Sequence, residues 1–350
     1  MKATFRKYTL NFKRPSGTSR GILTEKDSWF LILEDQGKIG IGECGLLKGL
    51  SCDDVQGYED QLQWVCGELE GGRIQLLPQL GRYPSIAFGL EQALRSLSAR
   101  HPFELFPSDF TRGEDRIPIN GLIWMGDREF MLRQVHEKLE QGFRCIKLKI
   151  GALDFESELD ILQTIRKEYS ADTIELRVDA NGAFSAPQAL EKLKRLSEME
   201  LHSIEQPIRP GQWETMRDLC MHTPLPIALD EELIGIGDVS RKEALLQTIG
   251  PQYLILKPSL LGGYAACDEW IRLAEKTGAG WWATSALESN IGLNAIAQWT
   301  YLKAGGMPQG LGTGSLFTNN FNSPLSVGGG YLSYDSNMHW NEQILSELCI

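Results

Sequence analysis

The stretch CIKLKI, residues 145 to 150, is a short apolar run that carries two lysines, Lys147 and Lys149, toward its carboxyl end. Four later apolar runs also carry charge near their ends: IELRVDA (174–180), HSIEQP (202–207), PIALDE (226–231) and YLILKP (253–258). The charged residues follow one another at steps that match one strand plus one crossover helix. Charge that always falls at the carboxyl end of a strand is typical of a β/α barrel, which gathers distant residues into one pocket.

The same alternation extends from residue 117 to about 320. Three further runs bring the expected strands to eight: IPINGLIW (117–124), GWWATSA (280–286) and QGLGTG (309–314). Seven amphipathic segments lie between the runs, at about 128–142, 155–170, 185–200, 212–222, 238–249, 263–278 and 289–303. Eight strands and seven helices predict an α/β fold, a (β/α)7β TIM-like barrel, in preference to an open sheet.

Residues 1–110 follow a different pattern, in which apolar and polar residues alternate up to about residue 45. This alternation predicts a three-stranded antiparallel meander, with turns at residues 15–17 and 35–37. Helical spacing then predicts two helices, over 54–70 and 86–100. The pattern indicates an α+β domain that caps the barrel.

The boundary between the two domains is expected in the Pro- and Asp-rich stretch 101–118. We therefore expect a capping domain over 1–110 and a barrel over 117–320 that carries the functional site. The tail, about 325–350, contains the strand-like VGGGYLSYD and is expected to rejoin the capping domain.

Composition restricts the function further. With 350 residues, of which 42% are hydrophobic, the chain can bury a full core, and a net charge of −11 gives no basic patch for nucleic acid. Seven scattered cysteines form no CxxC pair, and no apolar run is long enough to span a membrane. We expect a cytoplasmic enzyme with a small-molecule partner and with neither nucleic acid nor membrane as a partner. Its oligomeric state does not follow from the sequence.

The lysines are candidates for proton transfer. Lys147 and Lys149 share one face of their strand because side chains alternate, and two nearby ammonium groups lower each other's pKa. A lysine with a lowered pKa can act as a base near neutral pH, whereas the alternative is a pair of salt-bridged lysines at the barrel mouth. Lys257 ends the sixth strand, nearly opposite the second, so a bound molecule would have a lysine on each face.

Three carboxylates end three successive strands, at Asp179, Glu205 and Asp230. Three such groups in one barrel mouth would repel one another, which suggests a divalent cation between them. Oxygen ligands without histidine or cysteine favour Mg²⁺ over Zn²⁺. Asn181 and Glu231 lie close to these residues in sequence and are candidates to orient them, or ordinary helix-cap residues.

Candidate substrate contacts come from the same end of the expected barrel. Arg177 shares a strand face with Asp179 and is a candidate either to approach a carboxylate or to form a structural ion pair. The ends of the seventh and eighth strands contribute the remaining candidates, which are Ser285, Glu288, Asn290, Gly312 and Thr313.

The motifs KLK, DAN, EQP, DE and KP, in this order and spacing, resemble the enolase superfamily, and specifically its muconate-lactonizing-enzyme subgroup, over nearly the whole chain. The resemblance implies a shared half-reaction, in which a base removes the proton α to a carboxylate and Mg²⁺, or Mn²⁺ as a substitute, stabilises the enediolate. Matched by position, Lys149 resembles the base, Lys147 its tuning neighbour and Lys257 the second active-site lysine. The three strand-end carboxylates resemble the metal ligands, and residues 16–21 and 44–51 resemble the loops that cover the site.

Within the subgroup, stretches such as INGLIW, ALDEELIG and GLGTGSLF are most similar to dehydratases of menaquinone biosynthesis. These enzymes convert a succinyl-bearing cyclohexadiene carboxylate into an aromatic ring. An N-succinylamino acid racemase and a muconate cycloisomerase stay open, while GLGTG in place of an Asp-x-Asp after the eighth strand disfavours a dipeptide epimerase. A non-catalytic barrel that binds a metal or ligand is the alternative from another class.

Overall fold

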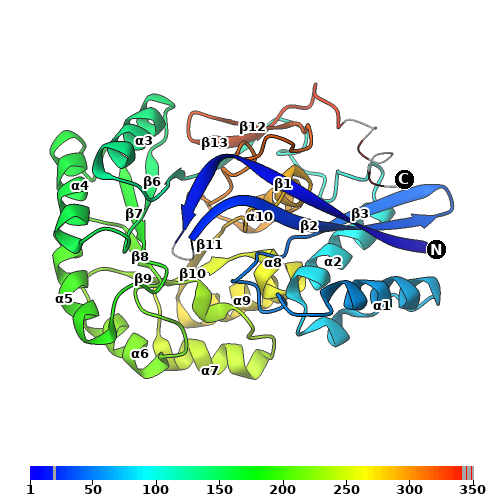
Figure 1. Cartoon of the computed structure of the whole chain (residues 1–350), viewed down its shortest axis with the longest axis horizontal. Coiled ribbons are helices and arrows are strands. Elements are labelled where there is room, and N and C mark those ends of the chain that lie inside the picture. The colour runs from blue at the N-terminus through cyan, green and yellow to red at the C-terminus, as the bar shows by residue number, and fades with distance from the viewer. Residues whose placement is uncertain (19–20, 341–343, 345–347, 349–350) are drawn as a thin grey trace.

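The structure is a computed structural model that describes residues 1–18, 21–340, 344 and 348. A ring of helices surrounds a curled parallel sheet, and a smaller unit of antiparallel strands and helices lies against it (Figure 1). The predicted fold class is confirmed. None of the helices within the described residues is long and apolar enough to cross a membrane.

The N-terminal sheet consists of β1 (Lys2–Thr18), β2 (Gly21–Asp35) and β3 (Lys38–Cys44), paired antiparallel in that order. The turn expected at 35–37 is confirmed, because Asp35 pairs with Lys38 and the two residues between them have positive φ. The turn expected at 15–17 is wrong. There β1 changes register between Asn11 and Ser16 and continues to Thr18, so an irregularity takes the place of a turn.

Two helices complete this unit, α1 (Tyr58–Glu70) and α2 (Pro84–Ser98), with a short 3-10 turn between them, η1 (Leu77–Leu80). Helix α2 lies directly on β3. A Cβ atom at Gly42 would come within 1.9 Å of the carbonyl oxygen of Gly89, so only glycine permits this approach. Apolar side chains from β2, α1 and α2 form a separate core there.

The barrel strands lie parallel and in chain order around the sheet. They are β5 (Gly121–Ile123), β6 (Cys145–Lys149), β7 (Glu175–Asp179), β8 (Ser203–Glu205), β9 (Ile227–Leu229), β10 (Tyr253–Leu256) and β11 (Gly280–Ala283). The seven predicted helices are all present, as α3 (Arg128–Glu140), α4 (Phe155–Glu168), α5 (Ala186–Ser197), α6 (Trp213–His222), α7 (Val239–Ile249), α9 (Gly263–Thr277) and α10 (Asn290–Lys303). Two short turns, η2 (Glu231–Leu233) and α8 (Pro258–Leu261), follow β9 and β10.

The eighth predicted strand, 309–314, is reduced to single bridges. Gln309 bridges Ile119 and Gly310 bridges Thr284, with Gly310 N–H donating to the carbonyl of Ala283 at 2.8 Å. These bridges link β11 to the segment before β5. A glycine-rich segment has few side chains to pack, which explains why it forms no regular strand.

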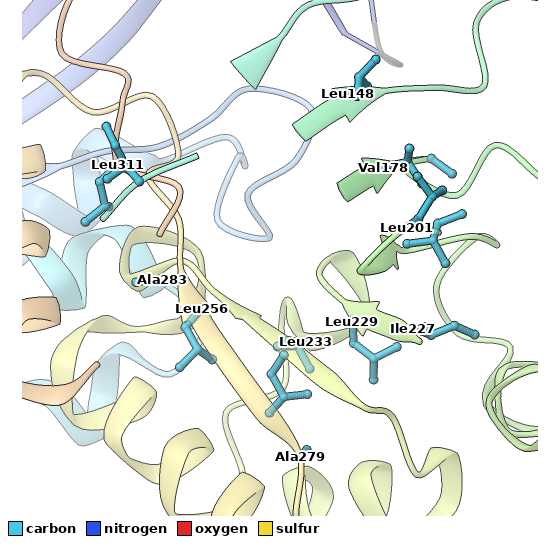
Figure 2. Close-up of a cluster of buried hydrophobic side chains, with 14 of the residues drawn as sticks. Leu148, Val178, Leu201, Ile227, Leu229, Leu233, Leu256, Ala279, Ala283 and Leu311 are labelled. Carbon is cyan, nitrogen blue, oxygen red and sulfur yellow. The ribbon is translucent and has the colours of Figure 1, made fainter. Parts of the chain in front are cut away.

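The core between strands and helices leaves the inner face of the barrel free for charge. Leu148, Val178, Leu229 and Leu256 belong to one large cluster of buried apolar side chains, part of which is drawn in Figure 2. Because side chains alternate along a strand, the neighbours of these residues point into the barrel. This alternation directs Lys147 and Lys149 inward together.

The tail forms β12 (Leu325–Gly328) and β13 (Tyr331–Tyr334), which pair with β4 (Arg116–Pro118). Beyond them, Trp340 stacks on Phe103 with ring centroids 4.2 Å apart and shares a buried cluster with Phe30, Ile32 and Ile41 of the N-terminal sheet. The hairpin β12–β13 thus pairs with the start of the barrel, and only the end of the tail contacts the N-terminal unit. We propose that this end belongs with the capping domain and that the division falls between 110 and 117.

Candidate active site

Strand register assembles the charged residues. Lys149 is the in-register partner of Asp179, and Asp179 is the partner of Glu205. Asp230 and Lys257 directly follow the last residues of β9 and β10. All of them therefore lie at the carboxyl end of the parallel sheet, as the sequence predicts.

Lys147 and Lys149 meet at one carboxylate. Asp179 Oδ2 lies 3.0 Å from Lys147 Nζ and 2.9 Å from Lys149 Nζ. Lys147 also donates to Glu205, and Lys149 donates to Asn181 Oδ1 at 2.7 Å. Asn181 in turn donates to Glu231 Oε1 at 3.0 Å. The predicted partners Asn181 and Glu231 are thus linked to the lysine side of the site.

Lys257 approaches from the other side of the same cluster. It donates a hydrogen bond to Asp230, and its Nζ lies 3.9 Å from Glu205 Oε1. The three carboxylates are 0 to 2% exposed, and each of them pairs with at least one lysine. Three lysines consequently face three acidic side chains at the base of the pocket.

The electrostatics correct one prediction. Burial alone would lower the pKa of Lys147, but the charges of Asp179, Glu205 and Asp230 outweigh it and raise the pKa. The predicted lowering by a neighbouring lysine is therefore wrong for Lys147. Burial together with the charge of Asp179 raises the pKa of Glu205 to about 8. Burial also opposes ionisation of Asp179, yet the lysine charges hold its pKa well below the ordinary range.

A divalent cation such as Mg²⁺ needs several oxygen donors gathered at one place. Within the described part of the chain, no group of three His, Cys, Asp or Glu side chains is arranged to hold a metal as the side chains stand, and lysines pair with the carboxylates instead. The three carboxylates nevertheless suit a divalent cation because of the donor atoms that they offer. Asp179, Glu205 and Asp230 supply only oxygen donors from adjacent strands, and Glu205 Oε1 is buried without a hydrogen bond. Hard oxygen donors of this kind suit a cation such as Mg²⁺.

A cavity of about 120 Å³ opens above the lysines. Its wall is largely apolar, and the residues of the first 50 that reach it are Leu23, Leu47, Lys48 and Leu50. The predicted covering loop 44–51 therefore contributes to the site. The barrel contributes Lys147, Lys149, Lys257, Asn181, Asn120, Leu122, Trp124, Leu260, Thr284, Ser285, Ala286, Leu287, Gly310, Gly312 and Thr313.

Three of the predicted substrate contacts line this cavity, namely Ser285, Gly312 and Thr313. Glu288 lies behind them. It is fully buried and accepts hydrogen bonds from Ser285 Oγ at 2.6 Å and Ala286 N–H at 2.8 Å, so it supports the wall without reaching the cavity. Asn290 also lies outside the cavity lining, where its side-chain amide donates to the carbonyl of Phe321 at 2.6 Å.

Arg177 is not brought to the cavity. Its Nε donates to Glu175 at 2.7 Å, Nη1 donates to the carbonyl of Pro308 at 2.9 Å, and the guanidinium lies 4.2 Å from the ring centroid of Trp282. Arg177 precedes Asp179 by two residues on the same strand face, so it lies one layer deeper in the barrel. Of the two alternatives, the structure corresponds to the ion pair.

Sequence reasoning missed two polar residues of the cavity wall, Asn120 and Thr284. Both have a buried side-chain oxygen without a hydrogen-bond partner, Asn120 Oδ1 and Thr284 Oγ1. The available signal was weak. Asn120 is the single polar residue of INGLIW, and Thr284 stands beside Ser285 in GWWATSA, so both lie in runs whose apolar character dominates.

Comparison with known proteins identifies the class. Residues 131–335 match the family described as Enolase C-terminal domain-like. The chain belongs to the enolase superfamily, as its strand-end motifs predict, and is an enzyme of that superfamily.

Individual relatives are more specific. The chain is similar to an o-succinylbenzoate synthase from Desulfotalea psychrophila, with 49% identity over 95% of this chain and 98% of that protein. It also resembles the crystal structure of MenC from Desulfotalea psychrophila, with a TM-score of 0.86, 46% identity, and coverage of 95% of this chain and 99% of that one. An N-succinylamino acid racemase from Thermus thermophilus is 35% identical, over 47% of this chain and 42% of that protein.

Proposed function

We propose that the chain is a Mg²⁺-dependent o-succinylbenzoate synthase of menaquinone biosynthesis. Its reaction would be the dehydration of 2-succinyl-6-hydroxy-2,4-cyclohexadiene-1-carboxylate to o-succinylbenzoate. The observation that carries the proposal is the cluster of Lys149 and Lys257 around three strand-end carboxylates, in a chain 49% identical to an o-succinylbenzoate synthase along almost its whole length.

The proposed roles follow from the contacts. Asp179, Glu205 and Asp230 would hold the divalent cation, with Mn²⁺ as a possible substitute for Mg²⁺. When bound, the cation supplies positive charge that stabilises the substrate carboxylate as negative charge develops on it. Asn181 and Glu231 would orient Lys149 through the hydrogen bonds that connect them.

Lys149 would act as the base. Its Nζ would accept the proton from the substrate carbon next to the carboxylate and return it to the departing hydroxyl group, which leaves as water. The substrate thus loses one proton and one hydroxide, and the ring becomes aromatic. Lys147 would tune this environment, and Lys257, on the other side of the cluster, would contribute positive charge without moving a proton.

A second candidate is N-succinylamino acid racemization. It is favoured by the partial match to the Thermus thermophilus racemase, and it would use two lysines, one on each face of the substrate, to exchange the α proton. The two reactions would use the same metal site and the same two lysines.

Parallel assays of the purified protein with Mg²⁺ test the proposal. One measures the absorbance of the aromatic product formed from the cyclohexadiene substrate, and the other follows optical rotation of an N-succinyl amino acid. We expect rapid dehydration, with any racemization slower. Racemization without dehydration would transfer the assignment to the second candidate, and a protein inactive in both assays would favour a non-catalytic barrel.

A further inference from the structure

Lys26, on strand β2 of the N-terminal sheet, is a buried cation that the proposed mechanism does not use. The residue is 4% exposed, and among the described residues its ammonium group donates one hydrogen bond, to Ser28 Oγ at 3.0 Å. Lys26 lines a small pocket together with Leu47 and Lys48, two residues of the covering loop that also line the cavity above the active-site lysines. An ammonium group at this depth needs negative charge nearby.

Two buried carboxylates lie close enough to provide that charge. Ser28 Oγ donates to Glu43 Oε1 at 2.7 Å, so one hydroxyl group links the lysine to the acid of β3. Glu288, just beyond the end of β11, is a second acid whose charge acts on Lys26. A Cβ atom at Gly292 would lie 2.7 Å from Glu43 Oε2 and 3.0 Å from Glu288 Cγ, which places the two acids side by side.

Glu288 in turn depends on the lysine. Its side chain is fully buried, and burial raises the pKa of this carboxyl, while the positive charge of Lys26 acts against the rise. The negative charge of Glu43 adds to the rise. Loss of Lys26 would therefore leave two carboxylates buried side by side without the ammonium group that stabilises them.

Glu288 holds one side of the cavity wall. Its Oε2 accepts hydrogen bonds from Ser285 Oγ at 2.6 Å and from Ala286 N–H at 2.8 Å. Ser285 Oγ itself accepts from Thr313 Oγ1 at 2.9 Å and from Leu287 N–H at 3.1 Å. Both lone pairs of this hydroxyl are thus used, so its proton is directed to Glu288. The carboxylate thereby fixes a hydroxyl group that lines the cavity.

The same carboxylate reaches the turn behind Lys257. Glu288 Oε1 accepts a hydrogen bond from Ser259 Oγ. Ser259 is fully buried and lies two residues after Lys257, in the short turn α8. The start of the covering loop packs on this bond, because a Cβ atom at Gly45 would lie 3.0 Å from Glu288 Cγ and 3.1 Å from Ser259 Oγ. Glu288 therefore connects the ends of β10 and β11 with the capping domain.

We propose that Lys26 is a positioning residue of the active site. Its positive charge stabilises the carboxylate of Glu288, and Glu288 then holds Ser285 in the cavity wall and Ser259 behind Lys257. A residue of the capping domain thus keeps an active-site lysine in place without touching the substrate. The inference rests on the proposed function, because its effect on turnover needs Lys257 as the charge that faces the substrate.

A pair of charge-removing variants tests this role in the Mg²⁺-loaded protein. We expect Lys26→Met to lower kcat for dehydration by about 10–100-fold, because small displacements of the groups around the substrate are costly. Adding Glu288→Gln to Lys26→Met should raise kcat about tenfold above Lys26→Met alone, since glutamine still accepts from Ser285 but carries no charge. Lys38→Met, an exposed lysine of the same sheet, is the matched control and should keep wild-type kcat.

Further measurements distinguish positioning from a contribution to stability alone. Circular dichroism checks that each variant is folded at the assay temperature. The denaturant midpoint of Lys26→Met should lie below that of the wild-type protein, with the double variant between them. Ser259→Ala removes the bond behind Lys257 and leaves both charges in place, so it should lower kcat severalfold with KM close to the wild-type value.

The outcomes separate the role of Lys26 from the function on which it rests. Wild-type kcat in folded Lys26→Met overturns the positioning role and leaves the proposed function standing, as does a double variant no more active than Lys26→Met. If Lys26→Met alone does not fold, the double variant decides, because it should fold and turn over substrate, and its failure to fold overturns the inference. A wild-type protein that neither dehydrates nor racemizes its substrates overturns the proposed function itself, and the role in turnover with it.

Discussion

Glu43, on the N-terminal strand β3, accepts hydrogen bonds from the backbone N–H of Ser289 at 2.9 Å and from its Oγ at 2.5 Å, at the start of barrel helix α10. Gly292 N–H also donates to Glu43, at 2.9 Å. The carboxylate is fully buried and satisfies N–H groups that a helix cannot pair by itself. Strand β3 is thereby anchored to the wall of the cavity just before the covering loop begins.

The fit around Gly292 predicts a reversal of the usual effect of alanine in a helix. A Cβ atom at Gly292 would lie 2.7 Å from Glu43 Oε2 and 2.8 Å from Glu288 Cβ. We expect Gly292→Ala to lower the free energy of unfolding by about 1–3 kcal/mol. Gly67 in α1, where a Cβ atom would have no neighbour within 4 Å, is the control, and Gly67→Ala should raise it by about 0.5–1 kcal/mol. Denaturant titrations measure both, and a stabilising Gly292→Ala would contradict the anchoring.

Replacing either active-site lysine should lower the activity without unfolding the protein. We expect Lys149→Ala and Lys257→Ala each to lower kcat for dehydration by at least about 100-fold, because one removes the base and the other the opposing charge. Lys167→Ala, an exposed position in α4, is the control and should keep wild-type kcat. Steady-state kinetics give the rates, and circular dichroism checks the fold. Wild-type turnover in either active-site variant would remove the proposed mechanism.

Metal binding can be measured without turnover. We expect calorimetry to detect Mg²⁺ binding to the wild-type protein and to show its loss in Glu205→Gln, since the variant removes one of three anionic donors. Glu175→Gln alters an acid that pairs with Arg177 deeper in the barrel and should retain binding. Chelation should stop dehydration, and added Mg²⁺ should restore it. Equal Mg²⁺ affinity in Glu205→Gln and the wild-type protein would exclude Glu205 as a ligand.

Stability should depend on pH through Glu91, which accepts the backbone N–H groups of Tyr264 and Ala265 at the start of α9. Burial raises the pKa of Glu91 from 4.5 to about 7, although these N–H groups act against the rise. The folded state therefore holds a proton that the unfolded state has lost between pH 4.5 and about 7. The stabilisation is complete below 4.5 and is lost as pH rises through 7.

The slope due to Glu91 is at most about 1.4 kcal/mol per pH unit. Glu91→Gln should flatten this part of the profile, because the amide does not titrate. Unfolding free energies of the wild-type protein and the variant, measured across that pH range, provide the comparison. Parallel profiles would show that Glu91 titrates alike in both states.

The barrel was predictable because a short stretch of sequence is enough to mark each of its strands. A buried parallel strand needs an apolar run, and a charge at the end of such a run is conspicuous, so CIKLKI and the four later runs mark both the strands and the charged cluster. The eighth strand and the turn at 15–17 were not predictable in the same way. A glycine-rich bridge and an irregular strand are both decided by what pairs with them.

The sequence by itself determined the order of strands and helices, the inward direction of the lysines and acids, and the superfamily, because all of these follow from periodicity and short motifs. Only the tertiary structure decided how deep each polar side chain lies in the barrel and which partners it has. Arg177 and Asp179 share a strand face, yet Trp282 and Pro308 hold Arg177 one layer below the cavity. The pKa of Lys147 rises because carboxylates at the ends of three other strands surround it. Such effects depend on distances between residues far apart in the chain, which no local pattern encodes.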